Sequence, residues 1–214
     1  MKLFTHSSIH ATIALMRIFA AIGMLILGLG LAGPTAAQSL ERYLSQCTGT
    51  DDELAIRGCT GILQSSGLSR NNRAVAYVRR GSAYSRQGEL GLAIDNFTNA
   101  IRRNPRSLPA YYNRGNIYLA QEKFDLAIGD FSRAISLQPD HSLSYSNRGS
   151  AYLGKGEIDR AIAEFDKALE IDPKNKQAIS NRALAYTKNG DIGGVLRNFG
   201  AVVRVFFRSL FGGK

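Results

Sequence analysis

Two stretches of the chain place an Asn-Arg-Gly triplet between tyrosines. They read YYNRGNIYLA from Tyr111 and YSNRGSAYLG from Tyr145. An asparagine amide can both donate to and accept from an extended peptide backbone. An arginine can hold a carboxylate through two parallel hydrogen bonds. The triplets therefore belong either to a peptide-binding site or to the packing of a helix.

Other side chains with reactive chemistry are few. His141 is the histidine farthest from the N-terminus, and its surroundings, QPDHSLS, are typical of a solvated turn. Asp51, Asp52 and Glu53 read as a helix N-terminus, where negative charge is favourable. The sequence holds no Cys/His cluster at metal-binding spacing, no glycine-rich phosphate loop and no nucleophile elbow. We therefore expect no enzyme activity, no metal and no cofactor.

The elements that carry the triplets repeat with a period of 34 residues. In the first unit Tyr77, Gly81 and Tyr84 fall on one face of a helix, and Ala93 and Phe97 on one face of a second helix. Helical glycine costs about 1 kcal/mol relative to alanine, so its recurrence predicts close helix packing, with Gly81 facing Ala93. The recurring positions are Tyr77, Tyr111 and Tyr145; Gly81, Gly115 and Gly149; Tyr84, Tyr118, Tyr152 and Tyr186; Ala93, Ala127 and Ala161; Phe97, Phe131, Phe165 and Phe199; Ala100, Ala134 and Ala168; Pro105, Pro139 and Pro173.

This pattern resembles the tetratricopeptide repeat, strongly over Ala74–Asn175 and weakly on both sides. The resemblance implies an all-α, right-handed α-solenoid of antiparallel helix pairs. The expected divisions are a signal peptide at 1–37, a helical cap at 38–73, repeats at 74–107, 108–141 and 142–175, and a degenerate fourth repeat with a basic, apolar C-terminal helix at 176–214. In that last unit Ala183 replaces the glycine, Val195 and Val202 take the alanine positions, Phe199 continues the phenylalanine series, and no proline ends the unit.

In this family the first helices of the units line a concave groove. The residues predicted to face it are Arg79, Ser82, Arg86, Asn113, Asn116, Asn147, Ser150, Asn181 and Lys188. Val78 and Ser82 occupy the first unit's positions of the family's carboxylate clamp, so a faithful clamp is absent. The alternative to a peptide groove is a solvated polar face.

Four arginines differ from this set: Arg80, Arg114, Arg148 and Arg182 share the packing face of their helices. Their stems can cover apolar surface while the guanidinium groups reach an acid. We expect a structural role, with Asp130 and Glu164 as candidate partners; ligand binding is the alternative.

The N-terminus predicts export. An apolar stretch from Ile18 to Leu31 precedes Gly33-Pro34, and small residues at Thr35 and Ala37 fit cleavage after Ala37. We expect an exported protein of the bacterial periplasm; the alternative is an inner-membrane anchor made by the uncleaved segment. In an oxidising compartment Cys47 and Cys59 are expected to form a disulfide, the alternative being two buried reduced cysteines.

The C-terminal tail combines an apolar stripe with positive charge only. The stripe comprises Val195, Phe199, Val202, Val203, Phe206 and Leu210; the cations are Arg197, Arg204, Arg208 and Lys214. It can extend the last repeat, dock on a membrane surface, or pack against a partner or a second copy of the chain.

The net charge of +10 permits anionic partners of several kinds. The repeat accounts for the aromatic residues that would stack on bases, so we expect no nucleic acid partner. The sequence predicts a non-enzymatic scaffold that binds a peptide or protein segment in the groove. The alternative is a membrane-associated assembly factor that docks through its C-terminal helix.

Overall fold

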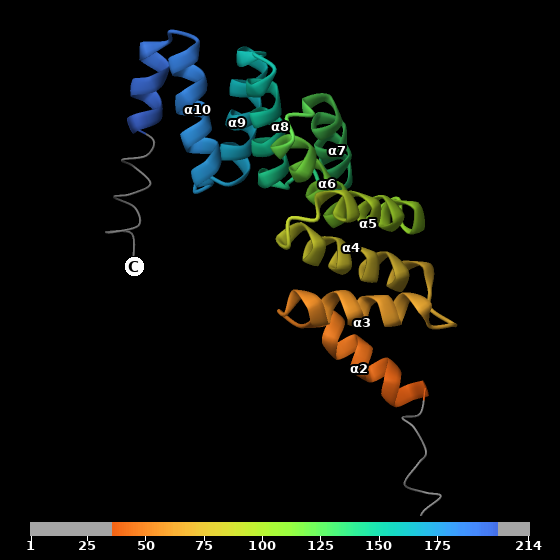
Figure 1. Ribbon diagram of the computed structural model, residues 1–214. Coiled ribbons are helices and arrows are strands. Elements are labelled where there is room, and N and C mark those ends of the chain that lie inside the picture. The colour runs from red at the N-terminus through yellow and green to blue at the C-terminus, as the bar shows by residue number, and fades with distance from the viewer. Residues whose placement is uncertain (1–35, 201–214) are drawn as a thin grey trace, which may run out of the picture. The chain divides into compact units, whose positions relative to one another are not determined.

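The computed structural model describes residues 36–200, which contain helices and no strand. The helices are α2 (Ala36–Thr48), α3 (Asp52–Gln64), α4 (Arg70–Arg86), α5 (Leu90–Arg103), α6 (Leu108–Ala120), α7 (Phe124–Leu137), α8 (Ser142–Gly154), α9 (Ile158–Ile171) and α10 (Lys176–Lys188). Residues 192–200 are also helical. The predicted all-α solenoid of helix pairs is confirmed (Figure 1).

Two predicted features lie outside the described residues: the apolar N-terminal segment, and the tail beyond residue 200. Within residues 36–200, no helix is both long and apolar enough to span a bilayer. The chain divides into two compact units, Met1–Arg42 and Tyr43–Lys214, and the repeats lie in the second.

Each repeat is held together by a phenylalanine ring lying against a glycine. A Cβ atom added at Gly115 would lie 2.9 Å from Cε1 of Phe131, and one at Gly81 would lie 2.9 Å from Cε1 of Phe97. The close approach predicted from the recurring glycine is confirmed, but its partner is the phenylalanine and not Ala93. Phe131 and Phe97 are almost completely buried. The ring of the second helix thus fills the space that the missing side chain leaves on the first.

The four arginines that recur at one position of each repeat have a structural role, as predicted. Nε and Nη2 of Arg114 donate to the carboxylate of Asp130 on α7, both at 2.8 Å, and Nη1 donates to Thr98 on α5 at 2.8 Å. One guanidinium therefore joins the second helix of its own unit to the second helix of the preceding unit. The bond to Asp130 raises the pKa of Arg114 above its ordinary value, so the guanidinium stays protonated.

The same connection recurs in the neighbouring units with different partners. Arg148 binds Glu164 and Ser132, Arg182 binds Asn198 and Asp166, and Arg80 binds Asn96 and Thr60. The rings of Tyr77, Tyr111 and Tyr145 lie beside these guanidinium groups, at 5.6, 6.0 and 5.6 Å. Asp130 and Glu164 are confirmed as the acidic partners.

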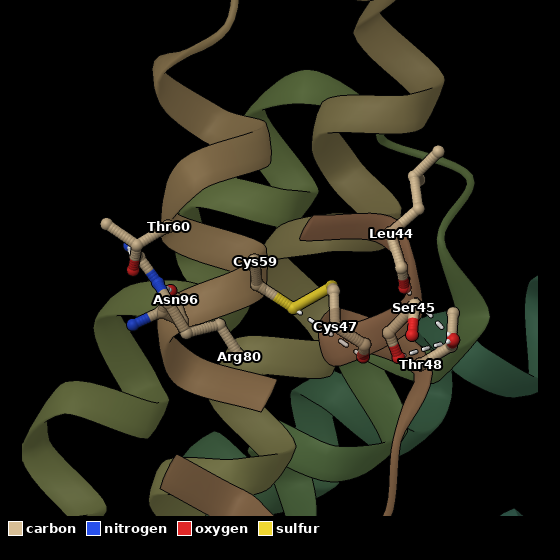
Figure 2. The surroundings of a disulfide bond; sticks show 8 residues. All are labelled: Leu44, Ser45, Cys47, Thr48, Cys59, Thr60, Arg80 and Asn96. Carbon is tan, nitrogen blue, oxygen red and sulfur yellow. Dashed lines mark hydrogen bonds between the residues drawn. A yellow bond between two sulfur atoms is a disulfide. The ribbon is translucent and has the colours of Figure 1, made fainter. Parts of the chain in front are cut away.

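The disulfide between Cys47 and Cys59 closes the N-terminal cap, with a Cα–Cα distance of 4.7 Å. It joins the C-terminal end of α2 to the middle of α3, and Figure 2 shows it beside Arg80, Thr60 and Asn96. Asp51 caps α3 by accepting a hydrogen bond from the backbone N–H of Leu54, as its acidic start predicts. A covalent link here stabilises a helix that has few neighbours of its own.

The last helix departs from the prediction. Phe199, expected in the core, is 66% exposed, whereas Phe165 at the same repeat position is 0% exposed. Val195 is only half-buried, and Gly194 is buried although its counterparts in the earlier units are exposed. Asn198 stays buried, as Asn96 and Asp130 are in theirs. Ala183 carries a Cβ where earlier units have glycine, so a phenylalanine ring cannot seat there. Gly194 lets the backbone lie on Tyr186, where a Cβ would be 2.4 Å from the ring.

We expect the glycine–phenylalanine contact to be sensitive to one methyl group. Gly115→Ala should lower the free energy of unfolding by about 1–3 kcal/mol, because the new Cβ overlaps the ring of Phe131. Gly129→Ala is the matched control in the next helix. No atom lies within 4 Å of its added Cβ, so it should raise stability by about 0.5–1 kcal/mol. Urea denaturation measures both, and equal effects of one sign would contradict the model of packing.

The arginine contacts predict an order of sensitivity. Arg114→Ala leaves the carboxylate of Asp130 buried without a cation and should cost about 3–5 kcal/mol of unfolding free energy. Arg80→Ala leaves only the neutral Asn96 and Thr60 and should cost about 1–3 kcal/mol. The double variant Arg114→Met, Asp130→Leu should recover most of the loss. Chemical denaturation tests this order, which a larger loss for Arg80→Ala would refute.

Candidate functional site

The first helices of successive units lie next to one another and form one layer of the solenoid. α4 contacts α6, α6 contacts α8, and α8 contacts α10. Their outward side carries the polar positions that the sequence predicted for the groove. This surface is the candidate site, because backbone groups within the helices are already paired and only side chains are offered to a ligand.

Two cavities open on this surface at its N-terminal half. The larger, about 520 Å³, is lined by residues of the cap and α4 that include Thr50, Val78, Arg79, Ser82 and Arg86. The smaller, about 330 Å³, lies between α4 and α6; its lining residues are Ser82, Ser85, Arg86, Leu90, Phe97, Asn113, Asn116, Ile117 and Ala120. Ser82 and Arg86 belong to both walls. Each cavity is lined by both apolar and polar side chains, which is typical of ligand sites.

The two arginines of the larger cavity are not equivalent. Arg86 is paired: its Nε donates to Asp52 of α3 at 2.8 Å. Arg79 is exposed, and no hydrogen bond or ion pair to it is found within residues 36–200. Arg79 is therefore the cation at this end of the surface that can receive a carboxylate from a ligand without losing a partner.

The predicted asparagine ladder exists, and its rungs bond to one another. The amide nitrogen of Asn113 reaches Ser82 at 3.5 Å, that of Asn147 reaches Asn116 at 2.7 Å, and that of Asn181 reaches Ser150 at 2.9 Å. Each bond joins residues 31 positions apart, so the ladder ties neighbouring first helices together.

The rungs differ in how much they can offer a ligand. Asn147 is 5% exposed, and Gln177 donates to its amide oxygen at 2.8 Å. A ligand at this rung must replace those bonds. Asn113 is only partly buried, and its bond of 3.5 Å is the longest in the ladder. The third and fourth units thus present a closed rung, whereas Asn113 and Asn116 border an open cavity. Lys188 is exposed at the far end, on α10.

His141 is not the solvated turn residue that its surroundings suggested. It is the N-cap residue of α8, its Nδ1 lies 2.7 Å from the hydroxyl of Ser144, and its ring packs edge-on against Tyr112 at 5.1 Å. Partial burial lowers the pKa of His141, and the nearby Asp140 opposes that shift. The hydroxyl of Tyr112 in turn accepts from Asn147 at 3.3 Å, so the histidine supports the closed rung.

Sequence reasoning missed several residues of the site. It selected polar positions, and therefore overlooked Leu90 and Ile117, which line the smaller cavity with apolar side chains. It also overlooked Ala120, which lines the smaller cavity at the repeat position that Arg86 and Lys188 occupy in other units. The third unit has Gly154 at this position, and there the ring of Phe124 fills the space. A small residue at this position therefore does not by itself indicate a cavity.

These features define a helical repeat scaffold with a candidate interaction surface on its first helices. The tetratricopeptide repeat family model matches residues 78–142, 112–176 and 146–194. Together these matches span more than half of the 214 residues. The chain belongs to the tetratricopeptide repeat family. A comparison with curated proteins found no match.

Solved structures agree in fold. A crystal structure of MamA superposes with a TM-score of 0.70 at 24% identity, covering 78% of this chain and 96% of that one. The first repeat domain of Spaghetti (RPAP3), bound to the HSP90 peptide SRMEEVD, gives 0.55 at 25% identity, covering 56% of this chain and 95% of that one. The second domain of human RPAP3, in complex with the HSP70 peptide SGPTIEEVD, gives 0.53 at 26%, covering 55% and 98%.

The environment of His141 predicts a pH effect on stability. Because its pKa is lowered in the folded state, the unfolded chain binds the proton more readily below the ordinary value of about 6.5. Stability should therefore fall as the pH drops through this range. Thermal unfolding at about pH 7.5 and about pH 5.5 should show a smaller decrease in Tm for His141→Gln than for the natural chain. An equal decrease in both would show that His141 does not contribute.

Proposed function

We propose that this chain is a non-enzymatic interaction scaffold that binds an extended protein segment across the two cavities on its first helices. The observation that carries the proposal is the pair of adjoining cavities that share Ser82 and Arg86. Together they extend from the cap to the second repeat, a length that suits several residues of an extended chain. The repeat domains of RPAP3 that this chain resembles were solved with peptides, which supports a peptide or protein ligand here.

The chemistry of the cavity walls supports an extended segment with at least one acidic group. Asn113 offers an amide that can pair with a peptide backbone, and Asn116 offers its amide nitrogen, because its oxygen already accepts from Asn147. Arg79 offers an unpaired guanidinium that can bind a carboxylate. Val78 and Ile117 supply apolar surface between them for a side chain of the ligand. Affinity would come from all of these side chains together, since each group contributes little alone.

The absence of catalytic activity is part of the proposal. Tetratricopeptide repeats generally serve as non-catalytic interaction scaffolds. Within residues 36–200, no three His, Cys, Asp or Glu side chains gather in a way that could hold a metal ion. His141, the histidine of this region, is committed to Ser144 and Tyr112.

We also propose that the chain works in the periplasm of a bacterium. The apolar N-terminal segment with small residues at Thr35 and Ala37 supports export. The disulfide between Cys47 and Cys59 suits an oxidising compartment. The alternative of an uncleaved anchor places the repeats in the same compartment. A membrane-docking function of the C-terminal helix is less favoured, because the similar complexes hold peptides.

A pair of matched substitutions should show which half of the surface binds the partner. Ser82→Tyr places a ring in the wall that both cavities share, and should abolish partner binding. Ser150→Tyr is its matched control at the same repeat position two units later, outside the lining of both cavities. A photoreactive residue at Ser85, in the smaller cavity, should capture a partner in cells with the natural chain and with Ser150→Tyr. Capture should be lost with Ser82→Tyr.

Thermal unfolding of both variants controls for damage to the fold, since Ser150 also accepts a hydrogen bond from Asn181. Partner capture that survives Ser82→Tyr in a folded protein would place the binding site elsewhere. Loss of capture only with Ser150→Tyr would move it to the third and fourth units.

A further inference from the structure

The last helix exposes an apolar stripe that the groove does not use. Ile192 is 75% exposed, Leu196 67% and Phe199 66%. Their spacing of four and three residues places them on one face of the helix at 192–200. Isolated exposed leucines are ordinary, but three large apolar side chains on one helical face are a candidate interaction surface.

The stripe occupies the positions that join one repeat to the next inside the chain. Ile192 and Leu196 correspond to Ile158 and Ile162, 34 residues earlier. In that unit Ile158 and Ile162 pack in one cluster with Ala178 and Ala185, which belong to the first helix of the following unit.

The other units repeat this contact. Leu90 and Ile94 pack in the cluster of Ala110 and Ile117, and Phe124 and Ile128 pack in that of Ala151. Each internal copy of the stripe is therefore covered by a helix. At 192–200 the same stripe is exposed, and no helix within residues 36–200 covers it.

The turned position of the last helix adds two features to this surface. Phe199 joins the stripe because it leaves the core. Gly200 lies one turn after Leu196, and no atom of residues 36–200 lies within 4 Å of a Cβ added there. A Cβ at Gly193 would approach only the tips of the Asp191 and Arg197 side chains. Glycines beside large apolar residues let a second helix approach closely. The apolar side chains of one copy can then pack into the space beside the glycines of a second copy.

The spacing in the sequence favours a helix of the same kind. The interval of four and three that begins at Ile192 continues at Val203, Phe206 and Leu210, which lie beyond the described residues. An apolar repeat every 3.5 residues is the pattern of a two-helix seam. Arg197, Arg204 and Arg208 are spaced by seven and four residues, on the opposite side of a helix with this spacing.

We propose that the stripe of Ile192, Leu196 and Phe199 is the interface at which two copies of this chain associate. The same surface serves on both copies, as in a symmetric dimer. The Ser82-containing cavities do not take part, so this inference is independent of the proposed peptide binding.

Sedimentation velocity of the naturally processed chain, over a range of micromolar concentrations, tests the proposal. The natural chain should sediment as a dimer. Leu196→Glu should weaken association at least about a hundred-fold, because it places an unpaired carboxylate in an apolar contact. Leu126→Glu is the matched control: Leu126 is 53% exposed on α7, the second helix of an earlier unit, and its change should leave the dimer intact.

A second variant guards against misfolding of the first. Leu196→Cys should form a disulfide between two copies on mild oxidation, seen on a non-reducing gel, whereas Leu126→Cys should not. A natural chain that stays monomeric, or a dimer that survives Leu196→Glu, would overturn the proposal. A monomer that binds vesicles of anionic phospholipid through the stripe would also overturn it, and would assign the surface to a membrane.

Discussion

A phenylalanine ring against a helical glycine sets the spacing of the two helices in each repeat, and the other features depend on it. The ring is buried because the glycine has no Cβ in its way. With the helices this close, the alanines at 93, 100 and their equivalents are also sealed from water. Where Ala183 replaces the glycine, Phe199 leaves the core and the last helix turns about its axis. The end of the solenoid thus differs from its middle through Ala183 and Gly194 together.

Arginines connect the repeats that the glycines and phenylalanines build. Each guanidinium lies between two successive second helices and donates hydrogen bonds to polar groups on both. Polar atoms that would otherwise be buried without a partner are therefore paired. In the Asn-Arg-Gly triplets the arginine and the glycine therefore serve the fold. The asparagine before them faces the ligand surface, and even there Asn147 bonds within the protein while Asn113 remains near open space. The surface is consequently uneven, with room for a ligand in its N-terminal half.

Much of this architecture could be predicted from the sequence, because the same residue types recur at equivalent positions of successive repeats. Recurring glycines, phenylalanines and prolines predict the helix pairs. Two cysteines 12 positions apart predict the disulfide of the N-terminal cap. The acids paired with Arg114 and Arg148 also follow, since helical periodicity places them on facing sides. The availability of each groove residue could not be predicted. Gln177 lies 30 positions from Asn147, and periodicity within one helix does not indicate such a contact.

The sequence by itself determined the repeat, its core positions and the polar face of its first helices, because these depend on local periodicity and on residue size. Only the tertiary structure decided which polar groups are already paired, where the cavities open and how the last helix is turned. These properties arise where side chains from separate helices compete for the same space and the same hydrogen bonds. The Cβ of Ala183 and the missing Cβ of Gly194 together determine how the last helix packs. Neither residue indicates that packing when it is considered alone.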